Sequence, residues 1–129
     1  MGLAVHTWHD DSLHPKNPPG YQDVILSINW LYHIPGATLD IFLKIYKAYL
    51  KRDGIIIFDM IDNSYNKVRN NAFHTADLKK PAELRRPSEY TIRMSRSEVV
   101  DVAAQNGFKV VRAAFINSRP QRAVYMVRA

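Results

Sequence analysis

Cysteine is absent from this chain of 129 residues, and glycine is scarce. The lack of cysteine excludes disulfides and thiolate metal sites, and it fits a protein of a reducing compartment. No two glycines are spaced as Gly-x-Gly, so no glycine-rich phosphate-binding loop is encoded. Long apolar runs are also missing, and the first residues lack the basic start and apolar stretch of a secretory signal. We therefore expect a cytoplasmic protein.

What the chain does contain is typical of one globular domain over residues 1–129. Hydrophobic residues make up 47% of the sequence, which is enough for a packed core. The net charge of +6 allows an anionic partner, but a charge of this size is also an ordinary solubility feature. No nucleic-acid-binding motif accompanies the charge, so a basic nucleic-acid-binding module is kept only as an alternative.

A short apolar run at 23–28 is the centre of the predicted fold. It follows the turn signal Pro18-Pro19-Gly20 and is too short for a helix of a globular protein. Such a run suits a strand that is covered on both faces. Polar and aromatic residues follow at 29–33, where the strand should end. Since ligands bind at the carboxyl ends of strands in open α/β sheets, this segment is a candidate site.

A βαβ unit follows from the next segments. Apolar residues recur at helical spacing over 38–51, and Gly54 is a plausible helix stop. The apolar run at 55–58 predicts a second buried strand, which ends at Asp59. We therefore expect two parallel strands joined by one helix through a right-handed crossover.

The remaining segments complete a mixed sheet. Ser95 and Glu98 form a capping box for a helix that ends at Gly107. The segment 62–93, called the excursion below, is polar and basic, with a weak helical patch near 82–86; we expect a long loop or lid. The other expected elements are a first strand at 3–8 and a C-terminal hairpin of strands at 108–115 and 122–128. One antiparallel strand should lie near an edge of the sheet.

The order of these segments resembles the C-terminal half of a class I S-adenosylmethionine-dependent methyltransferase. The stretch 21–34 is similar to the family's fourth strand and the segment after it, and 49–54 is similar to the helix end before the fifth strand. Gln105-Asn106-Gly107-Phe108 resembles the helix end before the sixth strand, and 108–128 resembles the sixth and seventh strands. The resemblance covers nearly the whole chain. It implies a three-layer, Rossmann-like half-sheet, mixed, with a C-terminal antiparallel hairpin.

The cofactor motif of that family is missing from this sequence. The family binds S-adenosylmethionine with a glycine-rich turn after its first strand and holds the ribose with an acid after its second. If 3–8 corresponds to the third strand, the first two strands are absent, and half of the cofactor site is absent with them. The resemblance thus implies methyl transfer to an unknown acceptor if a missing N-terminal half or a partner completes the site. The isolated chain should be weak or inactive.

Four residues are the candidates for cofactor binding. By resemblance, Asp10 and Asp11 match the position of a carboxylate against the adenine amino group; the alternative is a loop acid or a helix cap. Asn29 and Trp30 match the segment that flanks the methionine moiety. An aromatic ring there could cover the adenine or the sulfonium. The alternative for Trp30 is a core side chain under the end of the sheet.

Three more residues are candidates for contacts with the acceptor. His33 is chemically able to remove a proton, although a hydrogen-bonded structural histidine is the alternative. Asp59 ends the second parallel strand, where it faces substrate or caps a loop, and Tyr32 is a further substrate-binding candidate. His6 and His9 would point to opposite faces of a strand, so we expect no metal site.

Basic residues cluster in and after the excursion. They are solvated loop charges by default and contacts to an anionic substrate or a nucleic acid in the alternative. The residues are Lys79, Lys80, Arg85, Arg86, Arg93 and Arg96.

The strand at 23–28 also predicts association. In the family its equivalent pairs with the first strand, and here that partner is missing. An open apolar edge recruits another chain, so we expect a homodimer through this strand. The alternatives are that 3–8 folds in to cover the edge, or that the chain is a non-catalytic, truncated fold that serves as a dimerisation or interaction module.

Overall fold

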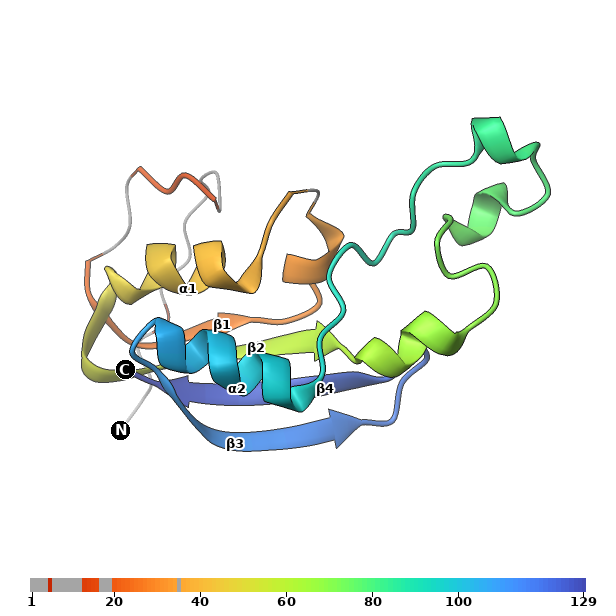
Figure 1. Ribbon diagram of the computed structural model, residues 1–129. Helices are drawn as coiled ribbons and strands as arrows, with labels where there is room; N and C mark the ends of the chain where they lie inside the picture. Colours follow the sequence, from red (N-terminus) through yellow and green to blue (C-terminus); the bar gives the residue numbers. More distant parts are fainter. Residues whose placement is uncertain (1–4, 6–12, 17–19, 35) are drawn as a thin grey trace.

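The computed structural model of this protein describes residues 5, 13–16, 20–34 and 36–129. They form one sheet of four strands in the order β1-β2-β4-β3, together with two α-helices (Figure 1). The α/β class and the mixed half-sheet expected from the sequence are therefore confirmed. The expected strand at 3–8, the pair His6 and His9, and the acids Asp10 and Asp11 lie outside the described residues.

The predicted βαβ unit is present. Strand β1 (Gln22–Ser27) and strand β2 (Leu50–Ile61) are parallel, and helix α1 (Leu39–Lys47) connects them. The Thr38 hydroxyl caps α1 by accepting the Ile41 N–H at 3.1 Å.

Helix α1 ends a turn earlier than the sequence suggests, and the prediction of a helix up to Lys51 was wrong at that end. The reason is that the chain already hydrogen-bonds to β1 there: the Gln22 N–H donates to the Tyr49 carbonyl at 2.8 Å. Leu50 then pairs with Gln22 at the start of β2. Gly54 is not the helix stop but lies in β2, where an added Cβ would stand 2.9 Å from the Lys51 carbonyl oxygen.

The C-terminal part agrees with the prediction. Helix α2 (Arg96–Gln105) begins with the capping box of Ser95 and Glu98, and the chain leaves it through Gly107 at φ +74°. Strands β3 (Lys109–Ile116) and β4 (Arg122–Arg128) form the antiparallel hairpin. β4 is antiparallel to β2 as well, so it is the antiparallel strand next to an edge.

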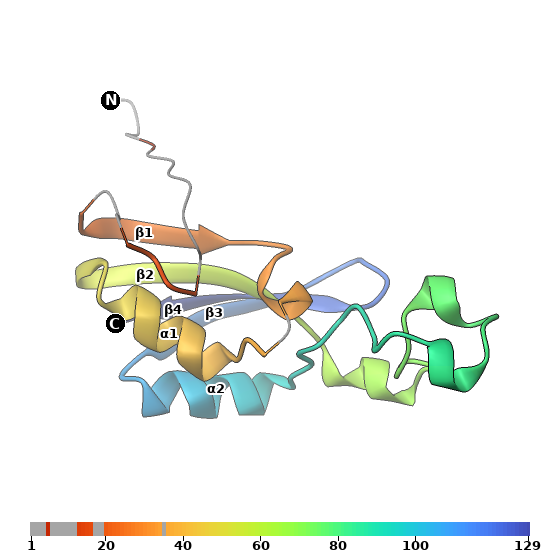
Figure 2. The same ribbon diagram turned by 90° about the horizontal axis from the view of Figure 1, so that it is seen from above.

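Both helices lie on the same side of the sheet (Figure 2). They are tied to each other where the Lys47 ammonium donates to the Asn106 carbonyl at 2.7 Å and the Asn106 amide donates to Asp40 at 2.9 Å. The core lies between the helices and the sheet. Its largest buried members include Phe42, Leu43, Ile56, Phe58, Met60, Val99, Tyr125 and Val127.

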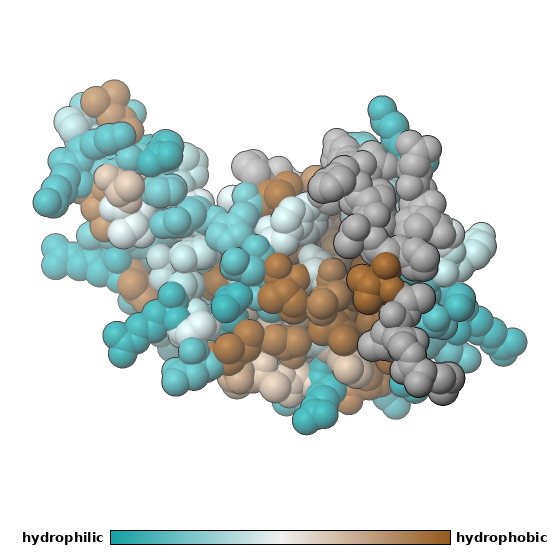
Figure 3. All heavy atoms as spheres, turned by 180° about the vertical axis from the view of Figure 1, so that it is seen from behind, coloured by the Kyte–Doolittle hydropathy of each residue, from teal (hydrophilic) through white to brown (hydrophobic). Residues whose placement is uncertain are grey.

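The opposite face of the sheet is not covered by any described helix. We call it the open face, and four aligned or neighbouring side chains define it: Val24, Leu26, Ile57 and Met126. Val24 is 52% exposed and Leu26 is 66% exposed, and Figure 3 shows the apolar surface on this side. The expectation that 23–28 is covered on both faces was therefore wrong for the described residues. Only Ile25 of this strand is buried, because its side chain belongs to the core on the side of the sheet that the helices cover.

The excursion leaves β2 and extends beyond the end of the sheet (Figure 1). It contains three short 3-10 helices, Asn63–Lys67, Thr75–Asp77 and Ala82–Leu84, and the last of them falls within the predicted helical patch. Its two ends meet at β2, where Ile61 forms a bridge with Arg93 and the Met94 N–H donates to the Ile61 carbonyl at 2.9 Å. A role as a lid remains a prediction. Among the described helices, none combines the length and the apolar character needed to cross a bilayer.

Candidate functional site

The carboxyl ends of β1 and β2 are joined by a hydrogen bond between a turn and a buried acid. Asn29 follows β1 in the left-handed region at φ 57°, a conformation that asparagine tolerates better than most residues. Its N–H donates to Asp59 Oδ1 at 2.7 Å. The left-handed turn therefore has a hydrogen bond that holds it against the neighbouring strand.

Asp59 is the centre of a network at this edge. Its side chain is 0% exposed, and Arg122 Nη1 donates to Asp59 Oδ2 at 2.7 Å. The Tyr32 hydroxyl lies 3.1 Å from the same oxygen and 2.9 Å from Asn29 Oδ1. Burial raises the pKa of Tyr32, so its phenol stays protonated near neutral pH and acts as a donor to these oxygens.

The network brings together three residues that the sequence singled out and one that it did not. Asn29, Tyr32 and Asp59 were candidates because they follow the ends of two parallel strands. Arg122 was missed. It opens β4, and the antiparallel register pairs it with Ile61, two residues beyond Asp59. The signal available in the sequence was a charged residue at the start of an interior strand. That strand, β4, is antiparallel to β2, which carries Asp59.

Trp30 and His33 occupy different surroundings. Trp30 is partly buried and packs on the core, with its ring 6.4 Å from that of Phe42. This contact favours the alternative of a core side chain under the end of the sheet. His33 is exposed in the 3-10 helix Leu31–His33, and its ring lies 4.8 Å from that of Tyr32 and 5.6 Å from that of Tyr90.

Most of the predicted basic cluster has structural partners within the chain. Lys80 and Arg86 both bind the buried carboxylate of Asp77, at 2.8 and 2.7 Å. The hydrogen bonds from Arg86 and Lys80 hold the pKa of Asp77 far below its usual range. Arg85 stacks over the Phe73 ring at 5.3 Å. These contacts support the excursion itself and give no support to a nucleic-acid interface.

No metal centre emerges from the described part of the chain, where no three His, Asp or Glu side chains are arranged to hold an ion. The cofactor candidates Asp10 and Asp11 lie outside the described residues, so Asn29 and Trp30 are the ones whose positions are known. Both belong to the segment directly after β1.

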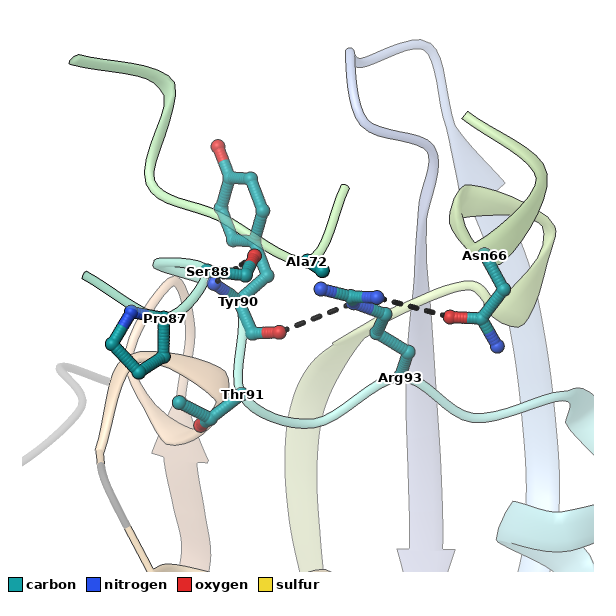
Figure 4. A pocket seen from close by; sticks show the side chains of 7 residues that line it. All are labelled: Asn66, Ala72, Pro87, Ser88, Tyr90, Thr91 and Arg93. Atoms are coloured by element: carbon teal, nitrogen blue, oxygen red, sulfur yellow. Dashed lines mark hydrogen bonds between the residues drawn. The ribbon is translucent and has the colours of Figure 1, made fainter. Parts of the chain in front are cut away.

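A cavity of about 450 Å³ lies where the excursion returns to the sheet (Figure 4). The side chains that line it are Asn66, Ala72, Pro87, Ser88, Tyr90, Thr91 and Arg93. Its wall is bonded to the segment after β1, because the Thr91 N–H donates to the Tyr32 carbonyl at 2.8 Å. The cavity thus adjoins the edge that carries Tyr32 and His33.

Comparison with known proteins connects this architecture to solved structures of methyltransferases. No protein-family model matches the sequence, and no curated protein sequence does. Solved structures do match, with a probability of 1.00. A S-adenosylmethionine-dependent methyltransferase from Methanosarcina mazei has a TM-score of 0.63 at 10% identity, over 92% of this chain and 64% of that one.

Two further matches contain a bound cofactor product. Magnesium protoporphyrin IX methyltransferase from Synechocystis PCC 6803, with bound S-adenosylhomocysteine, has a TM-score of 0.60 at 14% identity, over 92% of this chain and 48% of that one. The N-methyltransferase NodS from Bradyrhizobium japonicum WM9, also with S-adenosylhomocysteine, has a TM-score of 0.58 at 10% identity, over 92% of this chain and 51% of that one.

This chain therefore spans less than two thirds of the length of each of these structures. Identities this low are evidence for the fold. The described residues form the strand order β1-β2-β4-β3, with a parallel first pair and a C-terminal antiparallel hairpin. The chain has the Rossmann-like α/β fold of class I S-adenosylmethionine-dependent methyltransferases.

Proposed function

We propose that this chain is one part of a S-adenosylmethionine-dependent methyltransferase and carries the acceptor side of its active site. The observation that supports this most is the edge formed by β1 and β2. There a left-handed Asn29 is bonded to the buried Asp59, in a fold shared with structures that hold S-adenosylhomocysteine. The ends of parallel strands are where such folds bind ligands.

The residues present fit only part of a cofactor site. Asn29 would border the cofactor at the end of β1, and the turn at Asn29 is fixed by the Asp59 carboxylate. No glycine-rich turn occurs in the sequence. We therefore propose that polypeptide outside these 129 residues supplies the other side of the site. When bound there, S-adenosylmethionine would supply an electrophilic methyl group.

The other residues of the edge have one of two proposed roles, which are to position neighbouring groups and to transfer a proton. Asp59 is fully buried and already bonded to Asn29, Tyr32 and Arg122, so it acts by positioning rather than by touching the acceptor. His33 is exposed beside the cavity wall, and an imidazole is chemically able to accept a proton, so it would take the proton that the acceptor loses. Orientation and exclusion of water would be the protein's main contributions.

Calorimetric titration with S-adenosylhomocysteine tests this proposal. Measurable heat and protection from thermal unfolding are expected, with weak affinity because one side of the site is missing. Replacing Asn29 with Ala should reduce binding further, since it removes a candidate contact and strains the left-handed turn. A chain that gives no heat and no protection at millimolar ligand would count against cofactor binding by these residues.

The open face supports a second candidate function, that of an assembly module. β1 lies at the edge of the described sheet, and the face beside it carries exposed Val24 and Leu26. Apolar edges of this kind attract another strand. In this alternative two copies pair through 23–28 as a homodimer, and the cofactor edge has no catalytic use. Sedimentation velocity at micromolar concentration separates the alternatives, because a monomer that binds S-adenosylhomocysteine would leave the module without support.

A further inference from the structure

Among the described residues, Arg93 is the one charged side chain that lines the cavity shown in Figure 4. Its N–H groups donate to three neutral oxygens: Asn66 Oδ1 at 3.1 Å, the Asn71 carbonyl at 2.7 Å and the Tyr90 carbonyl at 3.2 Å. No carboxylate of the described residues pairs with it, whereas Arg86 and Arg122 each pair with a buried acid. The positive charge of Arg93 is therefore oriented but not neutralised.

The guanidinium is also held in place from one side. It stacks over the Tyr65 ring, with the central carbon 4.9 Å from the ring centroid. Three of its N–H groups are used by the oxygens above, and a guanidinium carries more N–H groups than that. The unused ones are available to donate to an anion in the cavity that Arg93 lines, and a planar guanidinium with several donors is what makes arginine effective for carboxylates and phosphates.

The rest of the lining suits a small organic anion. Ser88 accepts the Tyr90 N–H at 3.3 Å, which leaves its own hydroxyl hydrogen for a further acceptor. Pro87 and Ala72 provide apolar wall. Glu89, which would repel an anion, lies against His74 instead, with Glu89 Oε2 3.6 Å from His74 Nε2. The cavity is largely open to solvent, and its volume of about 450 Å³ is enough to hold a small organic ligand.

We propose that this cavity binds the methyl acceptor through a negatively charged group, with Arg93 as the residue that selects for the charge. The acceptor class is then a small acid with an apolar or aromatic body. The link between the cavity and Tyr32 through Thr91 puts the ligand beside the edge that carries His33. The assignment of the ligand as acceptor rests on the proposed methyltransferase function, but the binding of an anion does not.

The test uses matched probes on the full 129-residue chain labelled with nitrogen-15. Benzoate and phenyl phosphate carry the charge, and benzamide is the neutral counterpart of benzoate. NMR titration should show shifts at Asn66, Ser88 and the Arg93 side chain with both anions, and on the order of tenfold weaker binding of benzamide. Arg93→Gln should remove this preference, and Arg93→Lys should retain part of it. Arg85→Gln is the control, because Arg85 belongs to the excursion but does not line the cavity.

Equal binding of benzoate and benzamide by the unaltered chain would overturn the proposal, and so would shifts that map elsewhere. This comparison needs no variant, so it stands even if Arg93→Gln fails to fold. Titration with S-adenosylhomocysteine is run separately. If it binds and the anions do not, the acceptor class is wrong while the methyltransferase function stands. If the anions bind and it does not, the cavity is an anion site but the function proposed above loses its support.

Discussion

Two arginines of this chain have opposite environments, and the difference decides what each can do. Arg122 donates to a carboxylate that is 0% exposed, so its charge is already balanced inside the protein. Arg93 donates to carbonyl and amide oxygens, so its charge is available to a ligand. Substitution of Arg122 should thus show mainly in stability, and substitution of Arg93 mainly in binding.

Replacement of Arg122 with Gln should lower the free energy of unfolding by about 3 kcal/mol, because it leaves the Asp59 carboxylate buried without a counter-charge. Urea denaturation followed by circular dichroism measures the change. Arg128→Gln is the matched control, since Arg128 ends the same strand and is exposed; its cost should stay below about 0.5 kcal/mol. Equal costs for the two variants would mean that the buried pair contributes nothing specific.

The ion pairs of Asp77 lead us to expect that the stability of the excursion falls at acidic pH. Hydrogen bonds from Arg86 and Lys80 lower the pKa of Asp77 in the folded protein, so its contribution to stability is complete above the ordinary carboxylate pKa. That contribution declines as the pH falls below about 4. Hydrogen exchange of the Arg86 N–H, which donates to Asp77 Oδ2 at 3.0 Å, should report the loss as faster opening at lower pH.

In Asp77→Asn the protection of this amide should be low at neutral pH and should lose most of its pH dependence. Asp101→Asn is the control, since Asp101 lies exposed on α2 and forms no ion pair among the described residues. A protection curve of unaltered shape in Asp77→Asn would show that another group governs the opening.

At the scale of the elements, the hydrogen bond between Lys47 of α1 and Asn106 at the end of α2 depends on the absence of a side chain at Gly107. Gly107 has φ +74°, and an added Cβ would contact the ammonium of Lys47, which itself binds the Asn106 carbonyl. Gly107→Ala should therefore destabilise the protein by about 1–2 kcal/mol from backbone strain, with a further loss from displacing Lys47. Thermal unfolding of Gly107→Ala in the natural and the Lys47→Ala backgrounds separates the two causes. The cost should be smaller in the Lys47→Ala background, and an unchanged cost would assign all of it to the backbone.

Local signals in the sequence were sufficient for most elements. The Ser95–Glu98 box, the helical spacing after Thr38 and the apolar run at 55–58 each depend on residues close together in the chain, and each was confirmed. The end of α1 was placed too late because Tyr49 and Leu50 are suitable helix residues. Their hydrogen bonds to Gln22, which is distant in sequence, decide the outcome instead.

The candidate site was predictable only where strand ends fixed it. Asn29 and Tyr32 follow the end of β1, and Asp59 lies near the end of the parallel strand β2, which places the three together. Arg122 reaches Asp59 through the register of a different strand pair, which no local pattern contains. The partners of Arg93 are mostly backbone carbonyls of an irregular segment, and their positions depend on turns that the sequence does not specify.

At the scale of the whole molecule, the sheet is covered on one side only by the described residues. Leu26, Ile57 and Met126 are aligned across β1, β2 and β4 on the open face, and Figure 3 shows apolar surface on this side of the molecule. Folded domains seldom leave a continuous apolar patch of this kind in water, and larger ones mark sites of association. The additional polypeptide that we propose for the cofactor site and a second copy of this chain are both occupants that this surface would suit.

Leu26→Lys should weaken self-association by about tenfold or more, because it places a charge in the middle of the open face. Analytical ultracentrifugation over a concentration series gives the dissociation constant. Ile41→Lys is the matched control: Ile41 is 41% exposed on α1, on the other side of the sheet, and its replacement should leave association unchanged. A natural chain that sediments as a monomer throughout would contradict the homodimer.

The excursion enters and leaves the fold at neighbouring points, since Ile61 bonds to the chain on its return at Arg93 and Met94. Thr91 is bonded to the Tyr32 carbonyl as well, so the part of the excursion before Thr91 can be exchanged for a segment of different length while the strands keep their register. Under the function proposed above, selectivity for the acceptor and integrity of the scaffold are then separate properties of this polypeptide. A graft that joins residues 62 and 91 by another loop would alter the first and spare the second.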